Sequence, residues 1–252
     1  MAATLRSAPP YAEAMWVFPL VAAVVAFVFT ALLVRQYADR RRPYQLMWAI
    51  SLAMYGVASA AAVVGVRNGW SASDYRIYWA LGAVLNVPFL AAGELQLLVR
   101  NRAAHLVIDA ALVLIVASVV FVLRHATFDP VGLAPRLPSG KDVFGDGTPA
   151  HRLPQLISIP SYVLLLGGAL WSAWRMRGRP ELRDRFIGTL LIAFGATIVA
   201  GGATFAAFGN LPGFCITLVA GIAVMFLGFL RASRPMPGPF APTAPAPSTA
   251  TA

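Results

Sequence analysis

Three ionisable side chains, Glu94, His105 and Asp109, lie within long apolar stretches of the sequence. His105 and Asp109 are four residues apart, so on a helix they share one face. Two carboxyl groups held close together at low dielectric cannot both ionise cheaply, so one of them would hold a proton. This is the chemistry of a proton relay or a coupling-cation site. Glu, His and Asp are also a ligand set for a divalent metal.

A purely structural role of Glu94 and Asp109 is the alternative to these functional interpretations. Glu94 precedes Arg100 by six residues, and Asp109 follows Arg102 by seven. Each acid therefore lies roughly 10 Å along the helix from its nearest arginine, at 1.5 Å per residue. Because a long arginine side chain can bend back along the turn, an ion pair there would simply fix a helix hairpin.

A second polar group lies deeper in the apolar stretches. Asn86 is near the middle of one stretch, with Trp79 on the same helical face, and Tyr55 is near the middle of another. These three side chains can line a small-molecule pocket at the midplane of a membrane. Asn86 can instead bond to a neighbouring helix as a packing contact. Pro88 and Pro160 free backbone carbonyls inside their helices, which favours a cavity.

The composition sets the class of protein that must position these groups. The chain has 252 residues, 59% hydrophobic and 12% charged, whereas an ordinary soluble domain is about a quarter charged. This excludes a cytosolic enzyme and a nucleic-acid-binding domain. With Cys215 as the sole cysteine, a disulfide-stapled secreted protein is excluded as well.

Seven apolar stretches are long enough to span a membrane, which takes about 20 residues each. We therefore expect an all-α, seven-transmembrane helix bundle forming one domain over residues 1–231. Residues 232–252, rich in Pro, Ala and Thr, are expected to form a disordered cytoplasmic tail. The expected spans are about 16–34, 45–66, 76–99, 104–123, 155–174, 186–208 and 211–230.

The net charge of +10 comes almost entirely from arginine, since Lys141 is the only lysine. Thirteen arginines fall on one side of the expected bundle, in the first, third and fifth connections and after the last span, against seven basic residues on the other. The positive-inside rule then places the N-terminus outside and the C-terminus in the cytoplasm. The longest connection, about 124–154, is expected to be an irregular external loop.

Aromatic and small residues support this arrangement. Trp70, Tyr75 and Trp79 fall near the outer ends of spans, as in the aromatic belts of membrane proteins. Tyr55 and Tyr162 lie well inside, so each needs a local hydrogen-bond partner. The last two spans carry many small residues, which predicts close helix packing; they are Gly188, Ala196, Ala200, Gly201, Gly202, Gly221 and Gly228.

Seven helices with the N-terminus outside resemble the microbial rhodopsins, and the run from Pro88 to Leu95 is similar to the stretch that carries a proton-donor carboxylate in that family. This resemblance would place the donor at Glu94. Retinal, however, needs a lysine in the last helix, and none is present there. As a whole the chain resembles the uncharacterised seven-helix integral membrane proteins of GC-rich bacteria, which implies a bacterial cytoplasmic membrane and no particular activity.

These observations predict transport of a small solute, or proton- or cation-coupled transport, through the helix bundle. A membrane sensor or scaffold acting through a partner protein is the first alternative, and an intramembrane metal-dependent enzyme is the second. The bilayer is the expected partner, with a homo-oligomer or membrane partner protein in addition. No cofactor and no nucleic acid is expected.

Overall fold

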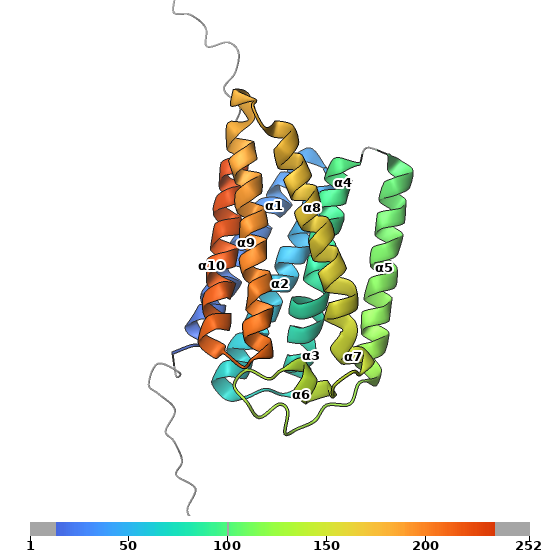
Figure 1. Ribbon diagram of the computed structural model, residues 1–252, viewed down its shortest axis with the longest axis vertical. Coiled ribbons are helices and arrows are strands. Elements are labelled where there is room, and N and C mark those ends of the chain that lie inside the picture. Colours follow the sequence, from blue (N-terminus) through green and yellow to red (C-terminus); the bar gives the residue numbers. More distant parts are fainter. Residues whose placement is uncertain (1–13, 100, 235–252) are drawn as a thin grey trace, which may run out of the picture.

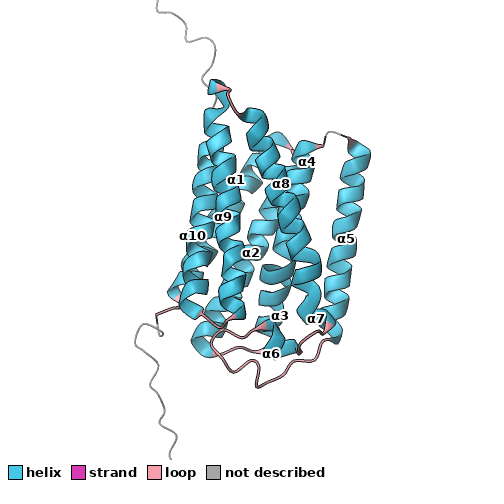
Figure 2. Cartoon of the chain, in the orientation of Figure 1, coloured by secondary structure: helices cyan, strands magenta, loops and turns pink. Residues whose placement is uncertain are grey.

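The computed structural model describes residues 14–99 and 101–234, and this part of the chain is helical without any strand (Figures 1 and 2). Seven helices in it are long and apolar enough to cross a membrane. They coincide with the seven expected stretches, so the all-α architecture with seven helices able to span a membrane is confirmed. The predicted tail lies almost entirely outside the described residues, and the orientation across the membrane stays a prediction.

Two of the seven spans each consist of three consecutive helical segments, the middle one a π-helix. The third span contains α3 (Ala72–Ile77), the π-helix η2 (Tyr78–Leu85) and α4 (Asn86–Leu98). The fifth contains α7 (Pro149–Leu153), the π-helix η3 (Pro154–Ser158) and α8 (Ile159–Met176). The other elements are α1 (Val17–Arg40), α2 (Pro43–Asn68), α5 (Arg102–His125), the short α6 (Gly140–Phe144), the 3₁₀ turn η4 (Pro180–Leu182), α9 (Arg183–Ala207) and α10 (Leu211–Ala232).

Short polar side chains begin several of these helices. Ser71, Asn101 and Asn210 each accept a hydrogen bond from a backbone N–H of the first turn. Such caps satisfy donors that have no partner within the helix.

Six of the spanning helices form a closed ring. Each helix contacts the next in the order α1, α2, α4, α8, α9, α10, and α10 contacts α1 again. The helix α5 stands outside this ring at one edge of the bundle and packs mainly on α4, η2 and α7 (Figure 1). Large apolar side chains on α5, such as Leu106 and Phe121, are about two thirds exposed or more. The outer position of α5 therefore gives it a broad lipid-facing surface.

The helices α9 and α10 pack more closely than any other pair. Gly188 faces Gly228 across this interface, and Gly195 faces Gly221; a Cβ atom at Gly195 would lie 2.6 Å from the Gly221 carbonyl oxygen. The expected close packing of the last two spans is confirmed. Gly201, in contrast, has open space where its Cβ would be.

The long connection after α5 covers one end of the bundle. Trp70 donates from Nε1 to the Arg136 carbonyl (3.0 Å), and Trp79 donates from Nε1 to the Ala150 carbonyl (3.1 Å). Tyr75 is fully buried against Phe144 of α6. These aromatic rings hold the connection rather than facing lipid headgroups, which corrects the aromatic-belt interpretation for Trp70 and Tyr75. We call this end the loop side and the opposite end, where α4 meets α5 and α8 meets α9, the Arg-rich side.

Candidate functional site

A large cavity lies inside the ring and reaches the loop side. Its volume is about 690 Å³, within the range of roughly 300–1,000 Å³ typical of small-molecule pockets. Its walls come from α2, η2, α4, η3, α8, α9 and α10, and residues 138–141 of the connection lie at its end. We call it the loop-side cavity.

Both π-helices form part of its wall. From η2 the cavity is lined by Tyr78, Trp79, Gly82 and Ala83, two pairs spaced four residues apart. The backbone N–H of Asn86 bonds to the carbonyl of Leu81, five residues earlier, which is the π-helical pattern. Such widened turns are rare and often occur at functional sites.

Ser158 joins the two π-helices. Pro88 has no N–H, so the carbonyl four residues before it, that of Val84, loses its usual helical donor. The Ser158 hydroxyl lies 2.7 Å from the carbonyl oxygen of Ala83 and 3.1 Å from that of Val84, and donates to this pair. The carbonyl that the proline was expected to free is thus satisfied by a side chain from the facing segment.

We expect the change Ser158→Ala to lower the free energy of unfolding by about 1–3 kcal/mol, because it leaves buried carbonyl groups without this donor. Ser161→Ala is the matched control, since Ser161 donates to Ile157 within its own segment (2.7 Å) and such bonds add little. Unfolding of both variants by SDS in mixed micelles measures the difference. Equal stability of the two variants would show that the link between η2 and η3 is unimportant.

The predicted pocket residues Asn86, Tyr55 and Trp79 all line the loop-side cavity. Tyr55 donates to the Leu218 carbonyl (2.9 Å) and Tyr162 to the Thr197 hydroxyl (2.8 Å), so each tyrosine has the expected hydrogen-bond partner. Asn86 is only 4% exposed, and its side-chain oxygen Oδ1 has no hydrogen-bond partner within the described residues. The packing role considered for the Asn86 carboxamide therefore leaves this oxygen unsatisfied.

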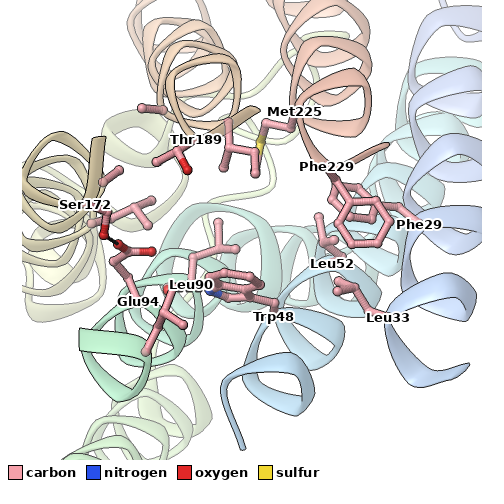
Figure 3. A pocket seen from close by; sticks show the side chains of 15 residues that line it. Phe29, Leu33, Trp48, Leu52, Leu90, Glu94, Ser172, Thr189, Met225 and Phe229 are labelled. Atoms are coloured by element: carbon pink, nitrogen blue, oxygen red, sulfur yellow. Dashed lines mark hydrogen bonds between the residues drawn. The ribbon is translucent and has the colours of Figure 1, made fainter. Parts of the chain in front are cut away.

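Glu94 faces a second, much smaller cavity of about 70 Å³, which we call the inner chamber (Figure 3). The Ser172 hydroxyl donates to Glu94 Oε1 at 3.0 Å. Thr189 of α9 also lines the chamber, beside apolar residues of α1, α2 and α10. Glu94 is 5% exposed, and a Cβ atom at Gly168 would lie 2.6 Å from its Cγ, so α8 can approach the carboxyl group only because residue 168 is glycine.

Asp109 and His105 do not reach this chamber. Asp109 accepts a hydrogen bond from Gln96 Nε2 at 2.7 Å, and His105 Nε2 lies 2.7 Å from the Val99 carbonyl oxygen. Glu94 and Gln96 are two residues apart, so they point to different sides of α4. Because α5 lies outside the ring, its acid meets the outer side of α4 and not the side that carries Glu94.

The structure therefore separates the three relay candidates that the sequence placed together. Within residues 14–99 and 101–234, no three His, Cys, Asp or Glu side chains form a group able to hold a metal ion. In the same part of the chain, Glu94 forms no ion pair with Arg102, whereas Arg100 lies outside the described residues. The ion pairs found there join Arg231 to Asp184 (3.0 Å) and His151 to Asp146 (3.5 Å).

The two cavities share one wall inside the ring. Leu52, Leu90, Leu165 and Met225 line both the loop-side cavity and the inner chamber. We call these four side chains the apolar layer. They come from α2, α4, α8 and α10, so side chains from four helices of the ring border both spaces.

Sequence reasoning missed the apolar layer, Ser158 and Ser172. Leucine and methionine in a spanning helix carry no signal that distinguishes a layer between two cavities from ordinary packing. Ser158 follows Pro154 and precedes Pro160, so the two prolines flanking it are the one local sign of irregular helix. Nothing in the local sequence points from Ser172 to Glu94.

The described residues form an all-helical bundle with two internal cavities and seven helices long and apolar enough to span a membrane. Comparison with known proteins adds no family to this description: no family model, no curated protein and no solved structure matches the chain.

Proposed function

We propose that the chain moves a small molecule through the helix ring. The molecule binds first in the loop-side cavity and then passes into the inner chamber. The shared apolar layer carries this proposal. Four side chains border both a large cavity that reaches one side of the bundle and a chamber holding a buried carboxyl group. Rearrangement of one layer would therefore pass a bound molecule from one space to the other.

Glu94 gives the proposed pathway a group that can couple it to protons. It is the one acidic side chain among the described residues that line either cavity. Ionisable groups inside membrane spans are costly and often mark proton or ion pathways. In our proposal the Arg-rich side faces the cytoplasm, as the positive-inside rule predicts.

Alternating exposure of the apolar layer tests this function without a known substrate. In a Cys215→Ser background, we expect Leu90→Cys to react with a charged, membrane-impermeant methanethiosulfonate added from either side of vesicles with one protein orientation. Leu90 borders both cavities, so a transport cycle must expose it to each side in turn. Measuring the modified fraction by mass spectrometry gives the result.

Ala62→Cys serves as the control, since Ala62 is fully buried and lines neither cavity. It should react from neither side. Reaction of Leu90→Cys from the loop side alone would overturn transport and favour a ligand-binding sensor.

A further inference from the structure

The walls of the loop-side cavity are mainly apolar. α9 lines it mostly with alanine, and these alanines are Ala196, Ala200, Ala203, Ala206 and Ala207. The described lining residues include no acid, and the basic ones, Lys141 and His151, belong to the loop side rather than to the middle of the ring. A charged ligand would thus lose its hydration at depth without gaining a counter-ion there.

Four hydroxyl groups of the lining already donate hydrogen bonds within the protein. Ser51 donates to the Asn86 carbonyl at 2.7 Å, and Tyr55 and Ser158 also donate to backbone carbonyls. Tyr162 donates to Thr197 of α9. These hydroxyl groups form hydrogen bonds between neighbouring helices, so their donor hydrogens are not available to a ligand.

The Asn86 carboxamide is different. It is buried at the level of the middle of the third span, it borders the cavity, and its Oδ1 is covered and lacks a partner within the described residues, so the carboxamide must rotate to meet a ligand. An unpaired amide oxygen in an apolar environment is costly, and a ligand that donates a hydrogen bond would remove this cost. Oxygen and nitrogen of an amide are assigned from such contacts, so a rotated carboxamide would offer a donor instead.

We propose that the loop-side cavity binds an uncharged, mostly apolar molecule with one hydrogen-bonding group, and that this group pairs with Asn86. This proposal names the substrate class for the proposed transport, and it concerns binding alone. Binding can therefore be found where transport fails, and the Leu90→Cys experiment can succeed where this ligand class is wrong.

Four probes of nearly equal shape test the ligand class: naphthol, naphthalene, naphthoate and naphthylmethylammonium. We expect the full-length protein in nanodiscs at neutral pH to bind naphthol about tenfold more tightly than naphthalene, as one buried hydrogen bond of about 1.4 kcal/mol provides. The two ions should bind more weakly than naphthol. Isothermal calorimetry measures all four affinities.

Asn86→Leu should reduce naphthol to the affinity of naphthalene and leave naphthalene unchanged. Gln96→Met is the matched control, because Gln96 is a second buried amide on α4 with an unpartnered oxygen, but it lines neither cavity. It should keep the preference for naphthol. Ala203→Phe, which fills the cavity, should weaken both probes, whereas Ala110→Phe on the exposed side of α5 should not.

Three results would overturn the proposal. Naphthoate binding as tightly as naphthol would indicate an anion site at Lys141 and His151. A naphthol preference that survives in Asn86→Leu would exclude pairing with Asn86. Equal loss in Gln96→Met and Asn86→Leu, or no probe binding at all, would show that the cavity has no such ligand site.

Discussion

Replacing Gly195 by leucine is expected to separate α9 from α10 and to cost about 3 kcal/mol of stability or more. A Cβ atom at this position would lie 2.6 Å from the Gly221 carbonyl oxygen and 2.7 Å from the Met225 backbone nitrogen. Backbone atoms cannot move aside as a flexible side chain does, so the helices themselves must shift. Close packing of small residues is a main source of helix association in lipid, and the loss should be correspondingly large.

Gly201→Leu in the same helix provides the control. A Cβ atom there meets nothing within 4 Å, and leucine suits a lipid-facing helix position. Titration with SDS in mixed micelles, followed by circular dichroism, compares the two variants. If Gly195→Leu unfolds at the same SDS fraction as Gly201→Leu, the glycine contacts between α9 and α10 do not hold the bundle together.

The sequence was sufficient for the spans because each is a long apolar run that only a membrane can accommodate. It was also sufficient to find the close approach of the last two helices, since glycine recurs in both. It could not say which glycines face the partner helix. Gly195 does and Gly201 does not, and this depends on how each helix is rotated in the ring.

In the candidate site, too, the sequence predicted some features and could not predict others. Asn86, Tyr55 and Trp79 were expected in a pocket because polar side chains in apolar spans turn inward; they border the loop-side cavity, and a ligand there stays a prediction. Glu94 and Asp109 were placed together because they flank a short turn. The position of α5 outside the ring puts them on different sides of α4, and the order of helices around a ring is set by long-range packing that no local pattern records.

The π-helices could be predicted only in part from the sequence. Pro88 does free a carbonyl, as sequence reasoning expects, but the resulting wall depends on Ser158, about 70 residues further along the chain. A proline marks where a helix can widen. It does not tell which neighbouring side chain will satisfy the widened turn, because that partner comes from another span.

The largest functional effect is expected from Glu94→Gln. In vesicles with a potassium diffusion potential and a trapped pH-sensitive dye, the wild-type chain should carry protons faster than protein-free vesicles. The variant should fall to the protein-free rate. Glutamine has nearly the same size as glutamate and can still accept the Ser172 hydrogen bond, but it cannot take up and release a proton. A loss of flux with unchanged stability would therefore separate proton transfer from a structural role of Glu94.

Asp109→Asn distinguishes the inner chamber from acids in general. Asp109 also lies in a span, yet it bonds to Gln96 and lines neither cavity, so its replacement should leave the proton flux at the wild-type rate. Equal loss in both variants would mean that the flux does not pass through the chamber. Wild-type flux in Glu94→Gln, or no flux in the wild type, would remove proton coupling and leave Glu94 as a buried carboxyl group that fastens α4 to α8.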